Sequence, residues 1–353
     1  MKELQVSSLR STKSMKVISD AGYFPVVLRT GPKSAIAAIR AGAGHIGIEG
    51  RLDVILTDDR GETWFEPIEA ADSDWDDRNP SLGRARDGTL VLAYHHQGNY
   101  DSNGDYIRGG DRVDTYLKRS TDDGRTWSEA YPLSIEGLRG RSPYGRMINV
   151  GDELLMNIYG AKMDGTEDEM VSYIVRSGDG GRTWHDPTEI AGGMNETALV
   201  NLPDDSILAL LRSDKGHPPS IYGSRSTDGG YNWTDPVRIT EDSEHPADAV
   251  LLSNGWILLV YGYRHEPYGV RGMVTTDQGR SWEKTPEIVF EDGLLLGDCG
   301  YPSIAVLQGG RILLMYYSAG ERGGRSHAGA YAKAVLFDEE DLISALEENW
   351  ASR

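Results

Sequence analysis

The sequence has very little cysteine and no long apolar segment. Cys299 is the only cysteine among 353 residues, so no disulfide can form within the chain. No run of about 18 apolar residues is present, so no membrane-spanning helix is expected. The first seventeen residues lack the apolar core of a signal peptide, which favours a cytoplasmic location, or a secreted one if a leader was removed.

Basic residues are scarce relative to acidic ones. The chain has 36 Lys and Arg against 55 Asp and Glu, a formal net charge of −19. Nucleic acids and anionic membranes attract basic surfaces, so neither is an expected partner. Metal ligands are also sparse, because the adjacent His95 and His96 would point to opposite faces of a strand. We therefore expect no metal and no other cofactor.

One turn motif is present five times. Each copy fits S/T-x-D-x-G-x-T/S/N-W, in which the Asp can accept hydrogen bonds from the turn and the Gly permits a positive φ. The copies are Thr57–Trp64, Ser120–Trp127, Ser177–Trp184, Ser226–Trp233 and Thr275–Trp282. A calcium loop is the weaker interpretation, because each copy offers one well-placed carboxylate and not an alternating series. The motifs are therefore interpreted as structural turns.

The same order of strands recurs around each motif. An alternating strand and a turn precede an apolar second strand, and a third strand leads into the motif. The second strands are predicted at Ser34–Ile39, Thr89–His95, Leu154–Tyr159, Ile207–Leu211, Ile257–Tyr261 and Ile312–Tyr317. Six such units predict an all-β fold, a six-bladed β-propeller with four antiparallel strands in each blade, as one domain over residues 1–353.

Both ends of the chain are assigned to the scaffold. The sixth unit has no motif, so we expect it to close the ring with an N-terminal strand near Met15–Ser19. Residues 338–350 are predicted to form a short helix outside the ring. Leu342, Ile343 and Leu346 would share one face of this helix.

Residues that precede the innermost strands should meet at one mouth of the central channel. They include Tyr23, Phe24, Arg78, Asn79, Ser142, Tyr144, Asn195, Glu196, His245 and Tyr301. The ends of the second strands add Arg40, His95, His96, Tyr159, Arg212 and Arg264. Arginines at this mouth suit an anionic ligand, since a guanidinium binds a carboxylate through two hydrogen bonds. A glutamate beside a tyrosine suits general-base activation of a phenol.

On these features the sequence resembles the sialidase (neuraminidase) superfamily. The run NETALVNLPDDSILALLRSD resembles the segment with the family's glutamate and second carboxylate-binding arginine, which implies those roles for Glu196 and Arg212. GVRGMVTTDQGRSW resembles the segment with the third arginine, here Arg271. GYPSIAVLQGGRILLMYYSAG resembles the tyrosine segment, so Tyr301 takes the place of the nucleophile. The resemblance implies a retaining exo-glycosidase acting on a glycan with an acidic terminal sugar.

Two positions depart from the family pattern. Tyr23 stands where the family has its first arginine, and Arg40 or Arg78 is the candidate replacement. The family's acid/base aspartate has no plain match in residues 40–50, where His45 is the candidate general acid and Glu49 the other titratable residue.

These departures widen the range of substrates and functions. A related 2-keto-3-deoxy sugar acid or another nonulosonic acid is an alternative to sialic acid. Tyr144, His245 and Asp248 are further candidate substrate contacts. A non-catalytic carbohydrate-binding propeller and a protein-interaction scaffold are the alternative functions.

Overall fold

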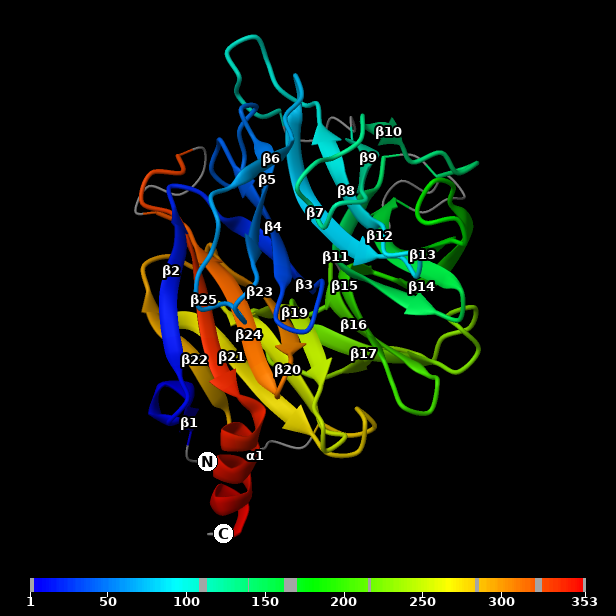
Figure 1. Ribbon diagram of the computed structural model, residues 1–353. Coiled ribbons are helices and arrows are strands. Elements are labelled where there is room, and N and C mark those ends of the chain that lie inside the picture. Colours follow the sequence, from blue (N-terminus) through cyan, green and yellow to red (C-terminus); the bar gives the residue numbers. More distant parts are fainter. Residues whose placement is uncertain are drawn as a thin grey trace.

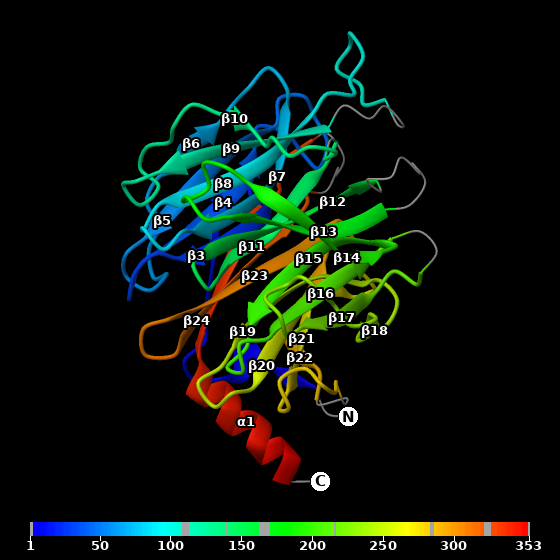
Figure 2. The same cartoon turned by 90° about the vertical axis from the view of Figure 1, so that its right-hand side faces the viewer.

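The strands of the protein are arranged as six consecutive blades. The computed structural model describes residues 3–107, 113–138, 140–161, 170–214, 217–282, 286–320 and 326–351. Figures 1 and 2 show that the sheets follow one another around the molecule in chain order, and that both termini lie at the same end beside the helix. The predicted propeller of antiparallel blades is confirmed.

Each blade begins with its innermost strand. The first three blades are formed by β3 (Tyr23–Arg29), β4 (Ala35–Ala41), β5 (Arg51–Thr57) and β6 (Ile68–Ala71); by β7 (Asp76–Arg84), β8 (Leu90–Gln97), β9 (Val113–Ser120) and β10 (Tyr131–Pro132); and by β11 (Ser142–Val150), β12 (Glu153–Ala161), β13 (Met170–Ser177) and β14 (His185–Gly192). A short parallel pairing of β7 with β11 joins the second and third blades into one sheet.

The remaining blades repeat this order. They are formed by β15 (Met194–Asn201), β16 (Ile207–Ser213), β17 (Ile221–Ser226) and β18 (Val237–Arg238); by β19 (Glu244–Leu251), β20 (Ile257–Tyr263), β21 (Tyr268–Thr275) and β22 (Ile288–Leu294); and by β23 (Cys299–Leu307), β24 (Arg311–Ser318), β25 (Tyr331–Asp338) and β2. All six predicted second strands are present; each continues one or two residues further than predicted, and β4 and β8 begin one residue later.

The N-terminal segment closes the ring as predicted. Strand β2 (Lys13–Ser19) pairs antiparallel with β25, from Lys13 opposite Leu336 to Ser19 opposite Tyr331. The preceding β1 (Leu4–Gln5) adds a parallel edge to β22 in the fifth blade, and a short 3-10 turn (Val6–Ser8) links the two strands. Both strands cover edges that would otherwise expose unpaired backbone groups.

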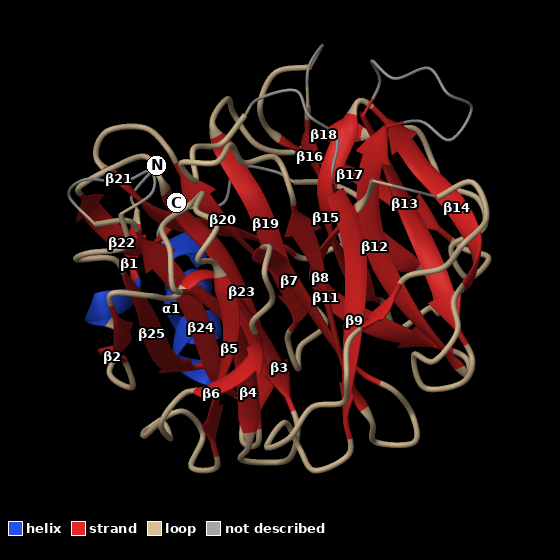
Figure 3. Ribbon diagram, turned by 90° about the horizontal axis from the view of Figure 1, so that it is seen from above, coloured by secondary structure: helices blue, strands red, loops and turns tan. Residues whose placement is uncertain are grey.

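The C-terminal helix is also where the sequence predicted it. Helix α1 (Glu339–Ala351) buries Leu342 and Leu346. These side chains pack in one cluster with Leu4 and Val6 from the N-terminal segment. Figure 3, the view from above, shows α1 behind β24 and β25, outside the sheets. No helix in the described part of the chain is long and apolar enough to cross a membrane.

The repeated motifs form the structural turns that the sequence predicted. The Asp59 carboxylate accepts the Thr63 backbone N–H at 2.9 Å and the Thr57 hydroxyl at 2.9 Å, and Gly61 has φ of +85°. The other four copies make the same backbone bond and carry a glycine of positive φ at the same place. Trp184 is 6% exposed and donates its ring N–H to Gly181 O. These bonds pin each hairpin locally.

The start of every innermost strand is irregular. The antiparallel register shifts in β3, β7, β11, β15, β19 and β23 within a few residues of the first paired position. Phe24, Asn79 and Tyr301 have φ of +52°, +50° and +45° at these points. A bulge adds a residue to one strand and re-aims its side chain. The irregularities therefore turn these residues toward the channel mouth, at a cost in backbone strain that favours a functional role.

Candidate functional site

A phenol, a carboxylate and a guanidinium form a hydrogen-bonded triangle. The Tyr301 hydroxyl donates to Glu196 Oε1 at 2.7 Å, and Arg212 Nη1 donates to Glu196 Oε2 at 2.6 Å and to Tyr301 Oη at 2.9 Å. Tyr301 is the third residue of β23, Glu196 lies in β15 and Arg212 in the neighbouring β16. The structure thus brings three of the sequence candidates into direct contact across the ring.

Burial keeps the phenol of this triangle protonated. Desolvation and the negative charge of Glu196 raise the pKa of Tyr301 to about 12, although Arg212 and Arg264 oppose the shift. Burial disfavours the Arg212 cation, but the charges of Glu196 and Tyr301 outweigh it and raise the pKa of Arg212. A carboxylate that accepts from the phenol and lies beside a permanent cation is placed to remove the phenolic proton.

The second arginine beside this triangle is Arg264, directly after β20. Its guanidinium carbon lies 5.4 Å from the centre of the Tyr301 ring. Arg271 instead turns to the outer strand β22, where Nη1 donates to Glu291 O at 2.7 Å and Nη2 pairs with Asp292. The structure therefore does not bring Arg271 to Tyr301, and Arg264 lies there in its place. The signal for Arg264 was its position just past a second strand, as for Arg212.

The two candidates for the missing first arginine have different surroundings. Arg40 is fully buried and donates to Gly44 O at 2.9 Å and to Gly47 O at 3.1 Å, while also pairing with Asp76. These bonds fix the loop that follows β4. Arg78 lies closer to the channel mouth, with its guanidinium carbon 5.8 Å from the centre of the Phe24 ring.

His45 belongs to that loop and contacts the neighbouring sixth blade. Its Nδ1 is 2.9 Å from Asp298 Oδ1, and its imidazole meets the Phe24 ring edge-on with centroids 4.9 Å apart. Phe24 in turn lies 4.9 Å from the Tyr301 ring. We call this group the central cup, whose members are Phe24, His45, Arg78, Glu196, Arg212, Arg264, Asp298 and Tyr301. Asp298 was not among the sequence candidates.

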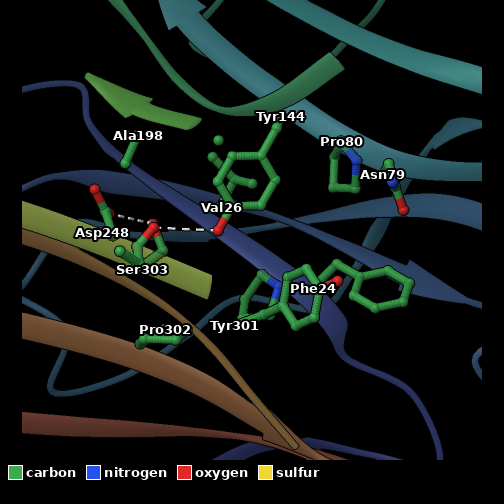
Figure 4. Close-up of a pocket in the computed structure, with 13 residues that line it drawn as sticks. Phe24, Val26, Asn79, Pro80, Tyr144, Ala198, Asp248, Tyr301, Pro302 and Ser303 are labelled. Atoms are coloured by element: carbon green, nitrogen blue, oxygen red, sulfur yellow. Dashed lines mark hydrogen bonds between the residues drawn. The ribbon is translucent and has the colours of Figure 1, made fainter. Parts of the chain in front are cut away.

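A small cavity adjoins Tyr301. A cavity of about 20 Å³, space for roughly one water molecule, lies between Tyr144, Tyr301 and Asp248 (Figure 4). Asp248 accepts hydrogen bonds from Ser303 Oγ at 3.1 Å and from Arg146 Nη2 at 2.8 Å. The structure therefore places Asp248 in a bond network between three blades beneath Tyr301. Tyr144 donates to Ala247 O at 3.2 Å.

His245 is buried beside the cup, and we expect it to make stability fall in acid. Burial and the positive charges of Arg212 and Arg264 lower the pKa of His245 to about 2. An unfolded histidine has a pKa of about 6.5, so the unfolded chain binds the proton more readily and stability is lost as pH falls below 6.5. At pH 5 the loss from this residue is about 2 kcal/mol.

Urea unfolding at pH 7 and pH 5 measures this effect. The difference in unfolding free energy between the two pH values should shrink by about 2 kcal/mol in His245→Gln. His185, whose side chain is 46% exposed, gives the control variant His185→Gln, which should keep the wild-type difference. An unchanged difference in His245→Gln would contradict the prediction.

The described residues contain no group of three or more His, Cys, Asp or Glu side chains arranged to hold a metal ion. A neutral phenol next to a carboxylate, with guanidinium groups around it, suits covalent attack on a centre that bears an anionic substituent.

The fold is a six-bladed propeller similar to that of sialidases. Residues 34–314 match the family model described as a BNR repeat-like domain, and the chain belongs to this family. Comparison with curated proteins gave no significant match.

Solved structures share the fold at low sequence identity. A protein of unknown function from Dyadobacter fermentans matches with a TM-score of 0.78 and 23% identity over 94% of this chain and 98% of its own. The Hadza microbial sialidase Hz136 matches with a TM-score of 0.67 and 19% identity, over 90% of this chain and 66% of that one. The NanB sialidase from Streptococcus pneumoniae gives a TM-score of 0.69 and 13% identity, over 92% and 69%. At such identities the likeness shows the fold alone.

Proposed function

We propose that the protein is a retaining exo-glycosidase that removes a terminal acidic sugar from a glycan through a tyrosyl intermediate. The observation that carries the proposal is the triangle of Tyr301, Glu196 and Arg212. Tyrosine nucleophiles are the exception to the usual carboxylate pair of glycosidases and are associated with sialidases. A neutral phenol approaches a carbon bearing a carboxylate with less charge repulsion than an Asp or Glu would.

The first step forms a bond between Tyr301 Oη and the anomeric carbon as the bond to the leaving oxygen breaks. The phenolic proton passes to Glu196, and His45 in its protonated form gives a proton to the leaving oxygen. In the second step His45 takes a proton from water, whose oxygen attacks the anomeric carbon as the bond from that carbon to Tyr301 Oη breaks, and Glu196 returns its proton to the Tyr301 oxygen. The configuration at the anomeric carbon is retained because it is inverted twice.

Arginines of the cup supply the anion site in this proposal. Arg212 donates to the reactive phenol and the Arg264 guanidinium lies beside its ring, while Arg78 lies beside the Phe24 ring. A guanidinium binds a carboxylate with charge and two parallel hydrogen bonds, so a sugar acid is the substrate class that fits. Sialic acid, another nonulosonic acid and a 2-keto-3-deoxy sugar acid all carry this carboxylate next to the anomeric carbon.

The proposal is tested with nitrophenyl glycosides of these acids beside a nitrophenyl galactoside as the neutral control. We expect turnover of at least one acidic glycoside and none of the neutral one. Proton NMR at early times should show the sugar released first in the anomeric form of the substrate. Binding of the acids without turnover of any of them would favour the non-catalytic carbohydrate-binding propeller.

Arg264 and Arg271 form a matched pair for the anion site. We expect Arg264→Met to lower kcat/KM for the acidic substrate by about 100-fold, since a charge-assisted bidentate contact of about 3 kcal/mol is lost. Arg271→Met should change kcat/KM less than about threefold, because Arg271 is paired with Asp292 on the outer strand. The reverse order of effects would show that Arg271 binds substrate and that the cup is assembled differently in the complex.

A further inference from the structure

His45 and Asp298 approach each other from opposite ends of the chain. His45 lies in the loop between β4 and β5, and Asp298 lies just before β23, where the sixth blade meets the first. His45 Nδ1 is 2.9 Å from Asp298 Oδ1. The Tyr317 hydroxyl donates to the same oxygen at 2.5 Å. The side chains of His45 and Asp298 are 31% and 25% exposed, so the pair borders the open part of the cup.

The ionisation state of the Asp298 carboxyl group decides which nitrogen of His45 carries a proton. Burial alone would raise the pKa of Asp298, but the bonds from His45 and Tyr317 and the charge of Arg264 outweigh it and lower that pKa. An ionised carboxylate can only accept hydrogen bonds, so His45 Nδ1 must be the donor. Nε2 is then the nitrogen that gains or loses a proton.

The imidazole is also held in place by its other neighbours. Phe24 packs edge-on against the His45 ring and against the Tyr301 ring, at 4.9 Å in both cases. The charged groups that act on His45 are Asp298, which favours its protonated form, and Arg78 and Arg264, which oppose it. An imidazole with one orientation and one tautomer, packed on the same Phe24 ring as the reactive Tyr301, is an arrangement that suits proton transfer.

We propose that Asp298 is a positioning residue that holds His45 through Nδ1, so that Nε2 transfers the proton to the leaving oxygen and later takes one from water. This inference rests on the proposed function. It assigns the proton-transfer role to a histidine–aspartate pair from two blades. Tyr317 supports the pair by satisfying the carboxylate, in the way that second partners orient catalytic histidines elsewhere.

The negative charge of a bound acidic sugar would favour protonation of His45. Burial, with Arg78 and Arg264, lowers the pKa of His45, while Asp298 raises it. A carboxylate bound by those arginines offsets their positive charge, which favours the protonated imidazole once substrate is present. Proton uptake should therefore accompany binding of an acidic sugar, measurable by calorimetry in buffers of different ionisation enthalpy.

Leaving-group dependence tests the role of the pair. The Asp298→Asn amide can donate to Nδ1 and favours the wrong tautomer. For a methyl glycoside, whose leaving oxygen needs a proton, we expect kcat/KM to fall about 100-fold or more. For a nitrophenyl glycoside, which leaves as an anion, we expect a fall of less than about tenfold. His45→Gln should change kcat/KM for the two substrates in the same way. The double variant Asp298→Asn/His45→Gln should lose no more kcat/KM than either single variant.

The control is Asp292→Asn, which removes a carboxylate on β22 that pairs with Arg271. This variant should leave the ratio of kcat/KM for the methyl and nitrophenyl glycosides at the wild-type value. Equal losses on both substrates in Asp298→Asn, or additive losses in the double variant, would overturn the proposal. Either result would show that Asp298 acts on folding or binding and not on proton transfer.

Nitrogen NMR of His45 gives a readout that needs no turnover. In the wild type we expect a proton on Nδ1, and in Asp298→Asn a proton on Nε2 together with a lower pKa of His45. The same tautomer and pKa in both proteins would reject the positioning role. If the wild type cleaves no acidic glycoside, the proposed function fails, and the spectra still decide whether Asp298 sets the state of His45.

Discussion

Replacing Tyr301 with phenylalanine is expected to lower kcat/KM for an acidic aryl glycoside by about 10⁴-fold or more, while the affinity for the free sugar acid changes little. The variant removes one oxygen, the atom proposed to bond the anomeric carbon. Losing a nucleophile removes the covalent route altogether, and only binding and electrostatic stabilisation remain.

Binding should survive this change because the rest of the triangle is preserved. Arg212 still donates to Glu196 at 2.6 Å in the wild-type geometry, so no buried charge is left unpaired. Affinity is measured by calorimetry and turnover by release of nitrophenol. The matched control is Tyr94→Phe, which removes a buried hydroxyl from the second blade. Turnover by Tyr301→Phe within about tenfold of the wild type would exclude Tyr301 as the nucleophile.

Arg212→Met is expected to abolish turnover and to destabilise the fold by about 3 kcal/mol. Glu196 is 5% exposed and pairs with Arg212, whose side chain is 23% exposed. Removing one partner of a buried pair leaves the other charge uncompensated. The same change removes a donor to Tyr301 and an arginine of the proposed anion site.

The double variant Arg212→Met/Glu196→Gln separates these effects. Neutralising both partners should recover most of the stability, because no isolated charge remains buried. Turnover should stay absent, because both the base and the cation are gone. Urea unfolding and kcat/KM measure the two properties independently. A double variant as unstable as Arg212→Met would show that the ion pair is not the source of the loss.

The architecture could be predicted because its signals are local. A turn motif such as Thr57–Trp64 forms its hydrogen bonds within eight residues. Each second strand is likewise recognised from the apolar residues within its own short segment. The closing strand near Met15–Ser19 followed from the repeat, since a sixth blade without a motif needs a partner strand. Helix α1 followed from a local signal of its own, the apolar face of residues 338–350.

The candidate site could be predicted only in part. Tyr301, Glu196 and Arg212 each sit at a fixed place in the blade repeat, so convergence of the blades places them together. Arg271 has an equally suggestive sequence context, yet the strand pleat directs it toward β22. A choice between Arg264 and Arg271 depends on where a side chain leaves its strand, and the register of β21 with β22 shifts between Val270 and Arg271.

By itself the sequence determined the number and order of the blades, the turns that hold them, and the phenol, carboxylate and guanidinium that face one another. Only the tertiary structure decided that Asp298 reaches His45 and that Asp248 bonds across the channel beneath Tyr301. The physical reason is how far apart along the chain the interacting residues lie. Repeated hairpins are specified by neighbours along the chain, whereas the pairing of His45 with Asp298 joins residues 253 positions apart and exists only when the last blade closes on the first.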